Sequence, residues 1–140
     1  MPTNVNIQNT LDVALQLDSS VQPPLGSDYW GIDSTSAPSD QTTRVLWMDR
    51  NEGITDGDTW VFTTSFEYAG VAIQLLESLT GTFASSDIKI QIMAGGQGSG
   101  WSDENTSLQF KGDDGNLYQI DGTFFLNGSY DDVTYTLLEI

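Results

Sequence analysis

The 140-residue sequence contains no histidine and no cysteine. Without histidine, the Ser-His-Asp triad, the Cys-His dyad and the His-ligated zinc site are all excluded. Without cysteine there is no disulfide, and the sequence leaves the redox state of its compartment open. The chemistry that survives uses carboxylates, as in a two-carboxylate glycoside hydrolase or a calcium site. A chain of this length without cleft-building insertions leaves little room for such a hydrolase, so we expect no enzyme, no catalytic residues and no cofactor.

Basic residues are scarce as well. Lys and Arg number 4 against 20 Asp and Glu, which gives a formal net charge of −16. Nucleic acid is therefore excluded as a partner, because its binding depends on neutralising phosphates with Lys and Arg. Anionic lipid surfaces are disfavoured for the same reason. A neutral or zwitterionic target, or a basic partner protein, fits the charge, and so does an acidity that only keeps a β-rich protein soluble.

Long apolar runs are the third absence. No stretch approaches the ~18 residues that a membrane-spanning helix needs. The first five residues, Met-Pro-Thr-Asn-Val, lack the basic segment and apolar run of a signal peptide. We expect a protein made in soluble form without a signal peptide.

Short stretches of alternating apolar and polar residues fill most of the chain. Such alternation covers residues 5–18, 42–50, 59–68, 71–76, 87–93 and 132–140, and Gly112-Asp113-Asp114-Gly115-Asn116 gives a strong hairpin signal. Residues 19–41 hold several Pro, Gly, Ser and Asp residues and predict a long loop. Strands at roughly 8–12-residue spacing predict a β-sandwich or barrel. We expect an all-β, antiparallel β-sandwich that forms a single domain over residues 1–140.

Acidic residues occur in pairs within the predicted turns. The pairs are Asp56 and Asp58, Asp103 and Glu104, Asp113 and Asp114, and Asp131 and Asp132. Turns favour Asp because its side chain bonds the local backbone. A calcium site would need several pairs to converge, and no complete EF-hand spacing is present, so we expect no metal site.

Aromatic residues divide into two groups. Those at strand alternation positions predict the core, and they are Trp60, Phe62, Phe66, Phe110, Phe124 and Tyr135. Others lie in predicted loops, namely Tyr29, Trp30, Trp101 and Tyr130. A loop aromatic either plugs the end of a sandwich or is an exposed anchor for a ligand or a membrane interface, and the sequence leaves both open.

Three short patterns resemble the aegerolysin family of small acidic β-sandwich proteins. The first is the opening pair of strands with a polar turn between them, residues 5–10 and 11–17, and the second is Trp30-Gly31. The third, Asp56-Gly57-Asp58-Thr59-Trp60-Val61-Phe62, is similar to the acidic-Gly-Thr-x-Gly-Thr-aromatic segment of the family. The pattern from Asn51 to Gly57 resembles the bacterial insecticidal members most. The resemblance covers the first three-quarters of the chain, and residues 111–140 match no family motif.

The resemblance implies a lipid-binding component of a binary toxin. It implies recognition of a target-cell lipid such as a sphingolipid, or of a receptor. It also implies joint action with a larger pore-forming partner in an insecticidal toxin, after non-classical release. Carried over by position, Trp30 and Asp56 would contact the lipid headgroup, with Tyr29 and Trp101 as further membrane contacts. Two alternatives remain. One is a carbohydrate-binding module that stacks sugars on the same loop aromatics, and the other is a small carboxylate hydrolase.

Overall fold

The computed structural model describes residues 2–50, 57–82, 85–128 and 130–140, and the regular structure of these residues is all β-strand. The strands are β1 (Pro2–Asn9), β2 (Leu15–Gln16), β3 (Asp18–Gln22), β4 (Trp30–Ile32), β5 (Ser36–Ala37), β6 (Gln41–Asp49), β7 (Thr59–Tyr68), β8 (Val71–Thr82), β9 (Ser85–Ala94), β10 (Gln97–Gly98), β11 (Thr106–Lys111), β12 (Leu117–Asn127) and β13 (Tyr130–Glu139).

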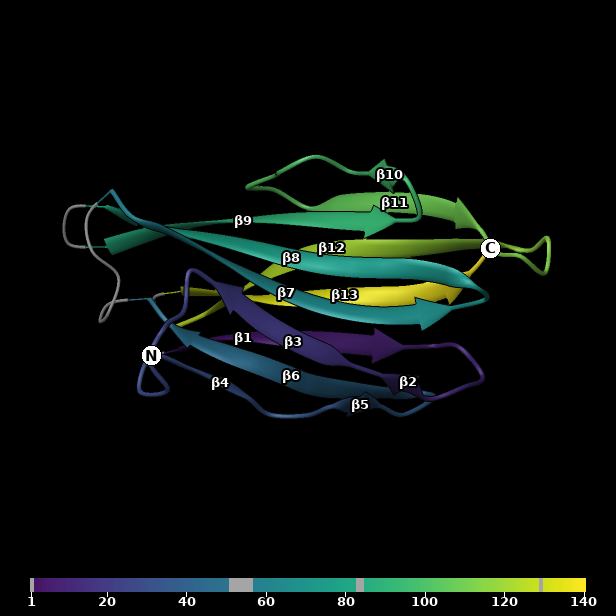
Figure 1. The fold of residues 1–140 in the computed structure, drawn as a ribbon, viewed down its shortest axis with the longest axis horizontal. Helices are drawn as coiled ribbons and strands as arrows, with labels where there is room; N and C mark the ends of the chain where they lie inside the picture. The colour runs from purple at the N-terminus through teal and green to yellow at the C-terminus, as the bar shows by residue number, and fades with distance from the viewer. Residues whose placement is uncertain (1, 51–56, 83–84, 129) are drawn as a thin grey trace.

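Two sheets pack face to face, which confirms the predicted β-sandwich (Figure 1). One sheet has six strands in the order β11-β12-β13-β1-β6-β4, and the other has five in the order β10-β9-β8-β7-β3. A small two-stranded sheet, β2-β5, lies beside them. Among the described strands the pairing is antiparallel, with one exception. β1 and β13 run parallel in the middle of the six-stranded sheet.

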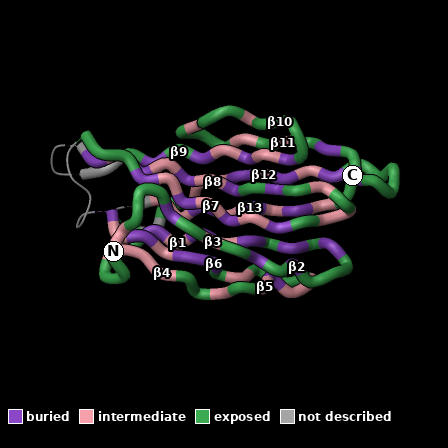
Figure 2. The backbone as a smooth tube through the Cα atoms, viewed as in Figure 1, coloured by how far each residue is buried: buried purple, intermediate pink, exposed green. Residues whose placement is uncertain are grey.

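The core lies between the sheets and follows the alternation of the sequence. In β7 the residues Trp60, Phe62 and Phe66 are buried, and in β9 the residues Ile90 and Ile92 are fully buried. Figure 2 shows the buried positions recurring along the long strands. Phe110 and Tyr135 are also buried, and Phe124 packs against the core from a half-buried position. The predicted core aromatics are therefore confirmed.

A β-bulge explains why β6 carries apolar residues on both faces. The register between β1 and β6 shifts at Val5, so that Val45 and Leu46 are both fully buried. A bulge adds one residue to a strand and moves the following side chains to the opposite faces. Trp47 therefore lies on the outer face, where a Cβ atom on Gly31 would collide with its ring.

The predicted strand over residues 11–17 is interrupted by a bend that Asn9 organises. The fully buried Asn9 side chain accepts a hydrogen bond from the Leu11 amide (3.0 Å) and donates to the carbonyls of Val13 (2.8 Å) and Ala37 (3.0 Å). Asn side chains stabilise turns in this way. Only Leu15–Gln16 is strand within this stretch, and Val13 is 46% exposed.

Residues 19–41 do not form the long loop that their composition predicts. The strand β3 continues to Gln22, and β4 and β5 each add a short strand. Pairing of β3 with β7 and of β4 with β6 places these pieces at the edges of the two sheets. Edge strands tolerate Pro and polar residues because one side of the strand needs no partner.

Candidate functional site

Trp30 is half-buried and packs against the core. It pairs with the buried Met48, so its side chain lies on the inner face of the six-stranded sheet. Its ring meets that of Phe62 edge-on at 5.9 Å, and its indole N–H donates to the Leu25 carbonyl (2.9 Å). This geometry matches the alternative in which Trp30 closes the sandwich. A role for Trp30 in lipid binding stays a prediction.

The other three predicted site residues differ in their surroundings. Tyr29 is half-buried, and its backbone bonds Gly26 (3.0 Å) and Asp49 (2.8 Å). Asp56 lies outside the described residues. Trp101 is 43% exposed and follows the two-residue strand β10.

The structure separates Trp30 from Trp101. Trp30 belongs to β4, which ends one side of the six-stranded sheet. Trp101 precedes β11, which ends the other side, and its neighbour Ser102 forms a bridge to Ile90 of β9. These segments lie along opposite edges of the sandwich (Figure 1). Trp30 and Trp101 therefore do not form one continuous surface.

Two adjacent exposed apolar side chains, Phe125 and Leu126, were not predicted as a site. They lie at the end of β12, and we call them the apolar tip. Phe125 is 55% exposed and Leu126 is 78% exposed. Their partners across the β12–β13 ladder are Asp132 and Asp131. The signal in the sequence was three consecutive apolar residues, Phe124, Phe125 and Leu126, directly before the turn Asn127-Gly128, because alternation cannot place all three side chains inward.

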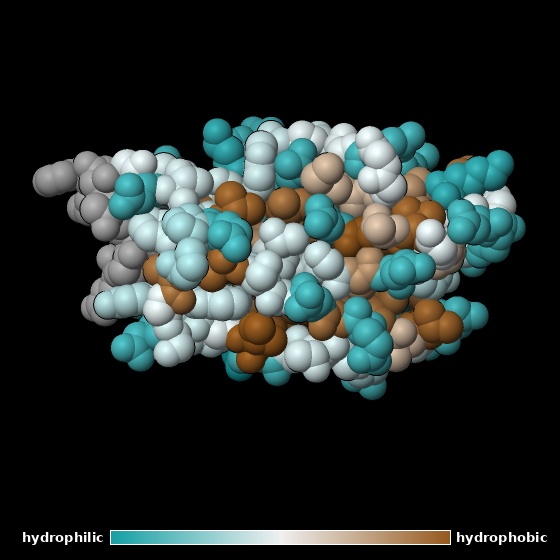
Figure 3. Space-filling model, viewed as in Figure 1, coloured by the Kyte–Doolittle hydropathy of each residue, from teal (hydrophilic) through white to brown (hydrophobic). Residues whose placement is uncertain are grey.

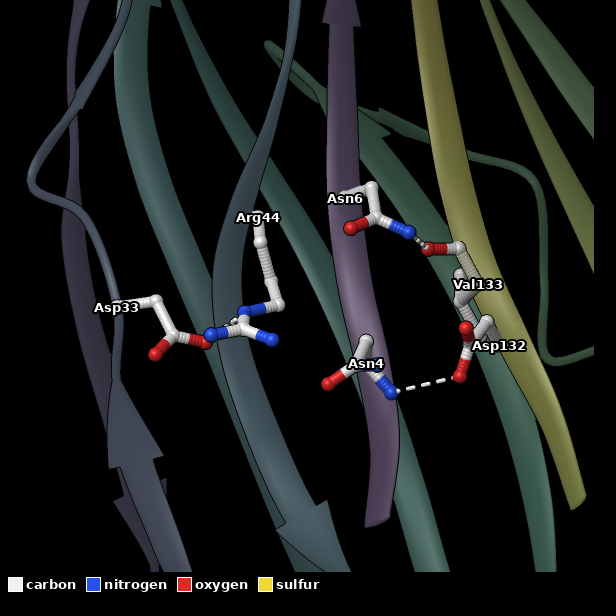
Figure 4. Close-up of polar contacts among 6 residues, drawn as sticks. All are labelled: Asn4, Asn6, Asp33, Arg44, Asp132 and Val133. Atoms are coloured by element: carbon white, nitrogen blue, oxygen red, sulfur yellow. Dashed lines mark hydrogen bonds and ion pairs between the residues drawn. The ribbon is translucent and has the colours of Figure 1, made fainter. Parts of the chain in front are cut away.

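The outer face of the six-stranded sheet is mostly polar apart from Trp47. Its side chains bond one another or the neighbouring backbone (Figure 4). Arg44 forms an ion pair with Asp33 (2.8 Å) across the outer edge, and the Asn4 amide donates to Asp132 (2.9 Å). Side chains that are already bonded to each other make a stable outer layer and leave few groups for a ligand.

Hollows lie on the outer face of the five-stranded sheet and at its side, where residues of both sheets line one of them. One hollow, of about 400 Å³, lies over the β7–β8 hairpin, and its lining holds one carboxylate, Glu67, and no basic residue. A polar hollow of about 290 Å³ opens at the side of β9 and includes Arg50, Lys89 and Asp131. The third, of about 220 Å³, lies beside Trp101. Figure 3 shows this face of the sandwich, where apolar side chains appear between polar ones in several places.

One titratable pair lies inside the core. Glu77 of β8 is fully buried, and Tyr135 of β13 reaches it from the opposite sheet at 2.6 Å between Oη and Oε2. Burial raises the pKa of Glu77 to about 8, although the hydrogen bond from Tyr135 lowers it. Burial also raises the pKa of Tyr135 well above 10.0, and the neighbouring carboxyl adds to this.

The geometry of this pair favours a protonated Glu77. The Tyr135 hydroxyl has two acceptors, Glu77 Oε2 (2.6 Å) and the Leu76 carbonyl (3.2 Å), but only one proton to donate. If Glu77 is protonated, its O–H donates to Tyr135 and the tyrosine proton is free to bond Leu76. Both contacts are then satisfied. Glu77 Oε1 has no hydrogen-bond partner among the described residues, which is less costly for a neutral carboxyl than for a carboxylate.

Gly122 allows the two sheets to come close at this point. It pairs with Tyr135, while Ile90 pairs with Glu77 on the facing sheet. A Cβ atom at Gly122 would lie 2.7 Å from Cδ1 of Ile90. The absence of a side chain therefore lets Tyr135 reach Glu77. The pair holds the sheets at a fixed spacing, and we assign it a structural role.

Two further properties bear on function. Within the described ranges, no three acidic side chains converge in an arrangement that could hold a metal ion. The described part of the chain also contains no helix with the length and apolar character needed to cross a membrane.

Comparison with known proteins finds no matching family model, no matching curated protein and no matching solved structure.

Proposed function

We propose that this protein is a non-enzymatic, membrane-binding β-sandwich that acts as the smaller component of a two-component pore-forming, insecticidal toxin. Membrane binding is proposed because the apolar tip is exposed to solvent. The binary toxin and the larger partner rest on the resemblance to aegerolysins, as does the choice of a lipid such as a sphingolipid.

The apolar tip suits the boundary between water and lipid. Phe125 and Leu126 are adjacent, exposed and carried by a β-hairpin, so they can enter a membrane without unfolding the core. Complete burial of a Leu or Phe side chain is worth about 1.5–3 kcal/mol. Scaled by their exposed fractions of 78% and 55%, the two side chains supply about 2–4 kcal/mol, and the middle of this range, about 3 kcal/mol, corresponds to about 100-fold in membrane affinity.

The charge beside the tip selects among membranes. Asp131 and Asp132 lie directly across the ladder from the two apolar residues. An anionic membrane would repel these carboxylates and the net charge of −16, whereas a neutral or zwitterionic one would not. We therefore expect binding to neutral or zwitterionic vesicles and weak binding to vesicles rich in phosphatidylserine.

A vesicle-sedimentation assay tests the proposal. The full chain is mixed with phosphatidylcholine, phosphatidylserine or sphingomyelin-containing vesicles, with and without calcium. The double variant Phe125→Ser/Leu126→Ser should lose about 10- to 100-fold of the affinity. The matched control is Leu117→Ser, because Leu117 is 48% exposed at the opposite end of the same strand. Equal pelleting of the tip variant and the control, or no pelleting of the unaltered chain on any vesicle, would contradict the proposal.

A further inference from the structure

A small groove on the outer face of the five-stranded sheet has a composition unlike the rest of that face. We call it the Trp101 groove. It has a volume of about 220 Å³ and is lined by Thr59, Ser78, Thr80, Asp87, Lys89 and Trp101. Its floor carries three hydroxyls, one carboxylate and one ammonium group, and its single large apolar side chain is an exposed indole.

The strand register builds the floor of the groove. Thr59, Thr80 and Asp87 are cross-strand neighbours on β7, β8 and β9 and form one row. Ser78 and Lys89 are neighbours in the next row. Because residues two apart on a strand are about 7 Å apart on one face, Asp87 and Lys89 stand on the same side at that spacing. The Thr59 and Thr80 hydroxyls are 2.8 Å apart and bond each other.

Trp101 is held beside this floor by backbone hydrogen bonds. The neighbouring Ser102 exchanges two of them with Ile90 of β9, at 2.8 and 2.9 Å. Ile90 is buried, so its bridge partner faces inward and Trp101 faces the outer side. The indole therefore stands over the groove on a fixed stretch of chain, with 43% of its surface exposed.

We propose that the Trp101 groove binds one pyranose residue of a glycan. The apolar C–H face of the sugar lies against the indole, and its hydroxyls bond the polar groups of the floor. Asp87 accepts hydrogen bonds from sugar hydroxyls, Lys89 donates to them, and the threonine and serine hydroxyls do both.

Charge and size both favour a neutral, polyhydroxylated ligand. Within the lining of the groove one carboxylate and one ammonium group balance, in a protein with a net charge of −16. Among the described residues, neither Asp87 nor Lys89 forms an ion pair, which leaves both able to bond a ligand. The groove is smaller than the roughly 300–1,000 Å³ sites that enclose drug-sized ligands, which suits one ring of a longer chain.

A glycan array probed with the fluorescently labelled full chain tests this inference. We expect a set of bound oligosaccharides that share one sugar residue. Titration calorimetry with one of these oligosaccharides should then give about a 10-fold loss of affinity for Trp101→Ala and for Asp87→Asn. Asp18→Asn is the matched control, because Asp18 is an exposed carboxylate on β3 that does not line the groove.

The result that would overturn the inference is an array without bound glycans, or affinity unchanged in both Trp101→Ala and Asp87→Asn. Circular dichroism checks the fold of each variant, and Thr80→Val provides a near-isosteric third test. The glycan proposal and the membrane proposal are tested independently, because the Phe125→Ser/Leu126→Ser variant should still bind the glycan. Phosphatidylcholine vesicles with and without glucosylceramide tell whether a lipid-linked sugar is accepted as well as a soluble one.

Discussion

The buried Glu77 should make the stability of the protein fall as the pH rises. Its usual pKa is 4.5, and in the folded protein it is about 8. Below pH 4.5 both the folded and the unfolded chain hold the proton. Between pH 4.5 and about 8 the folded chain keeps a proton that the unfolded chain has lost, so the free energy of unfolding decreases with pH. Above about pH 8 this contribution is gone.

The expected size follows from the two pKa values. They differ by 8 − 4.5 = 3.5 pH units, and each unit corresponds to about 1.36 kcal/mol. The full loss is therefore about 5 kcal/mol as an upper limit, because relaxation of the surroundings reduces the penalty of a buried charge. A loss of this size is a large part of the 5–15 kcal/mol stability that is typical of a domain.

Glu77→Gln separates this effect from the general repulsion among acidic residues. The amide cannot ionise, and its N–H can donate to the Tyr135 hydroxyl as the O–H of the protonated carboxyl does. Urea unfolding followed by circular dichroism at a series of pH values should give a shallower pH dependence for the variant. Relative to the unaltered protein, Glu77→Gln should gain up to about 5 kcal/mol between pH 4.5 and 8.

The matched control is Glu67→Gln, which removes one negative charge from an exposed position at the end of the neighbouring strand β7. It should follow the unaltered protein. If Glu77→Gln also runs parallel to the unaltered protein from pH 4.5 to 8, Glu77 is ionised inside the fold and the reasoning is wrong.

Three other substitutions test the same core. Tyr135→Phe removes the hydrogen bond that lowers the pKa of Glu77, so the decline in stability should extend to higher pH in the same unfolding series; an unchanged range would contradict this. Gly122→Ala should destabilise the fold by about 1–3 kcal/mol, because its Cβ atom would lie 2.7 Å from Ile90, and Ile90→Val should recover part of the loss in denaturant midpoints. Asn9→Ala leaves two backbone carbonyls and one amide without their side-chain partner. The free energy of unfolding, measured by heat or urea, should fall by about 2–4 kcal/mol. A fall below about 1 kcal/mol would mean that the bend needs no support from the side chain.

Alternation predicted the sandwich well where one face of a strand is buried and the other is wet. The inward positions of β7, such as Trp60, and those of β9, such as Ile92, follow that rule closely. The hairpin at residues 112–116 lies where its Gly and Asp residues predict. The bulge at Val45 was not predicted, because an extra residue leaves no mark in a strand that is apolar on both sides.

The site was harder to predict than the fold. Trp30 lies among turn-forming residues, and only the pairing of its strand with β6 places the ring inside. Glu77 carried a signal: continuing the alternation of Ile73 and Leu75 puts residue 77 on the inner face. The partner of Glu77 could not be predicted from the sequence, because Tyr135 belongs to the other sheet and lies 58 residues away in the chain.

The parallel pairing of β1 with β13 has a consequence for how the chain folds. Contacts such as that from Asn4 to Asp132 join positions 128 residues apart, whereas the β7–β8–β9 meander joins neighbours. Closing long loops costs entropy before any contact forms, so such pairings form late. The six-stranded sheet should therefore be completed after the five-stranded one, because β1 pairs with β13 only late in folding. Pulse-labelling hydrogen exchange during refolding should show amides of β8 protected before those of β1, and the reverse order would exclude this sequence of events.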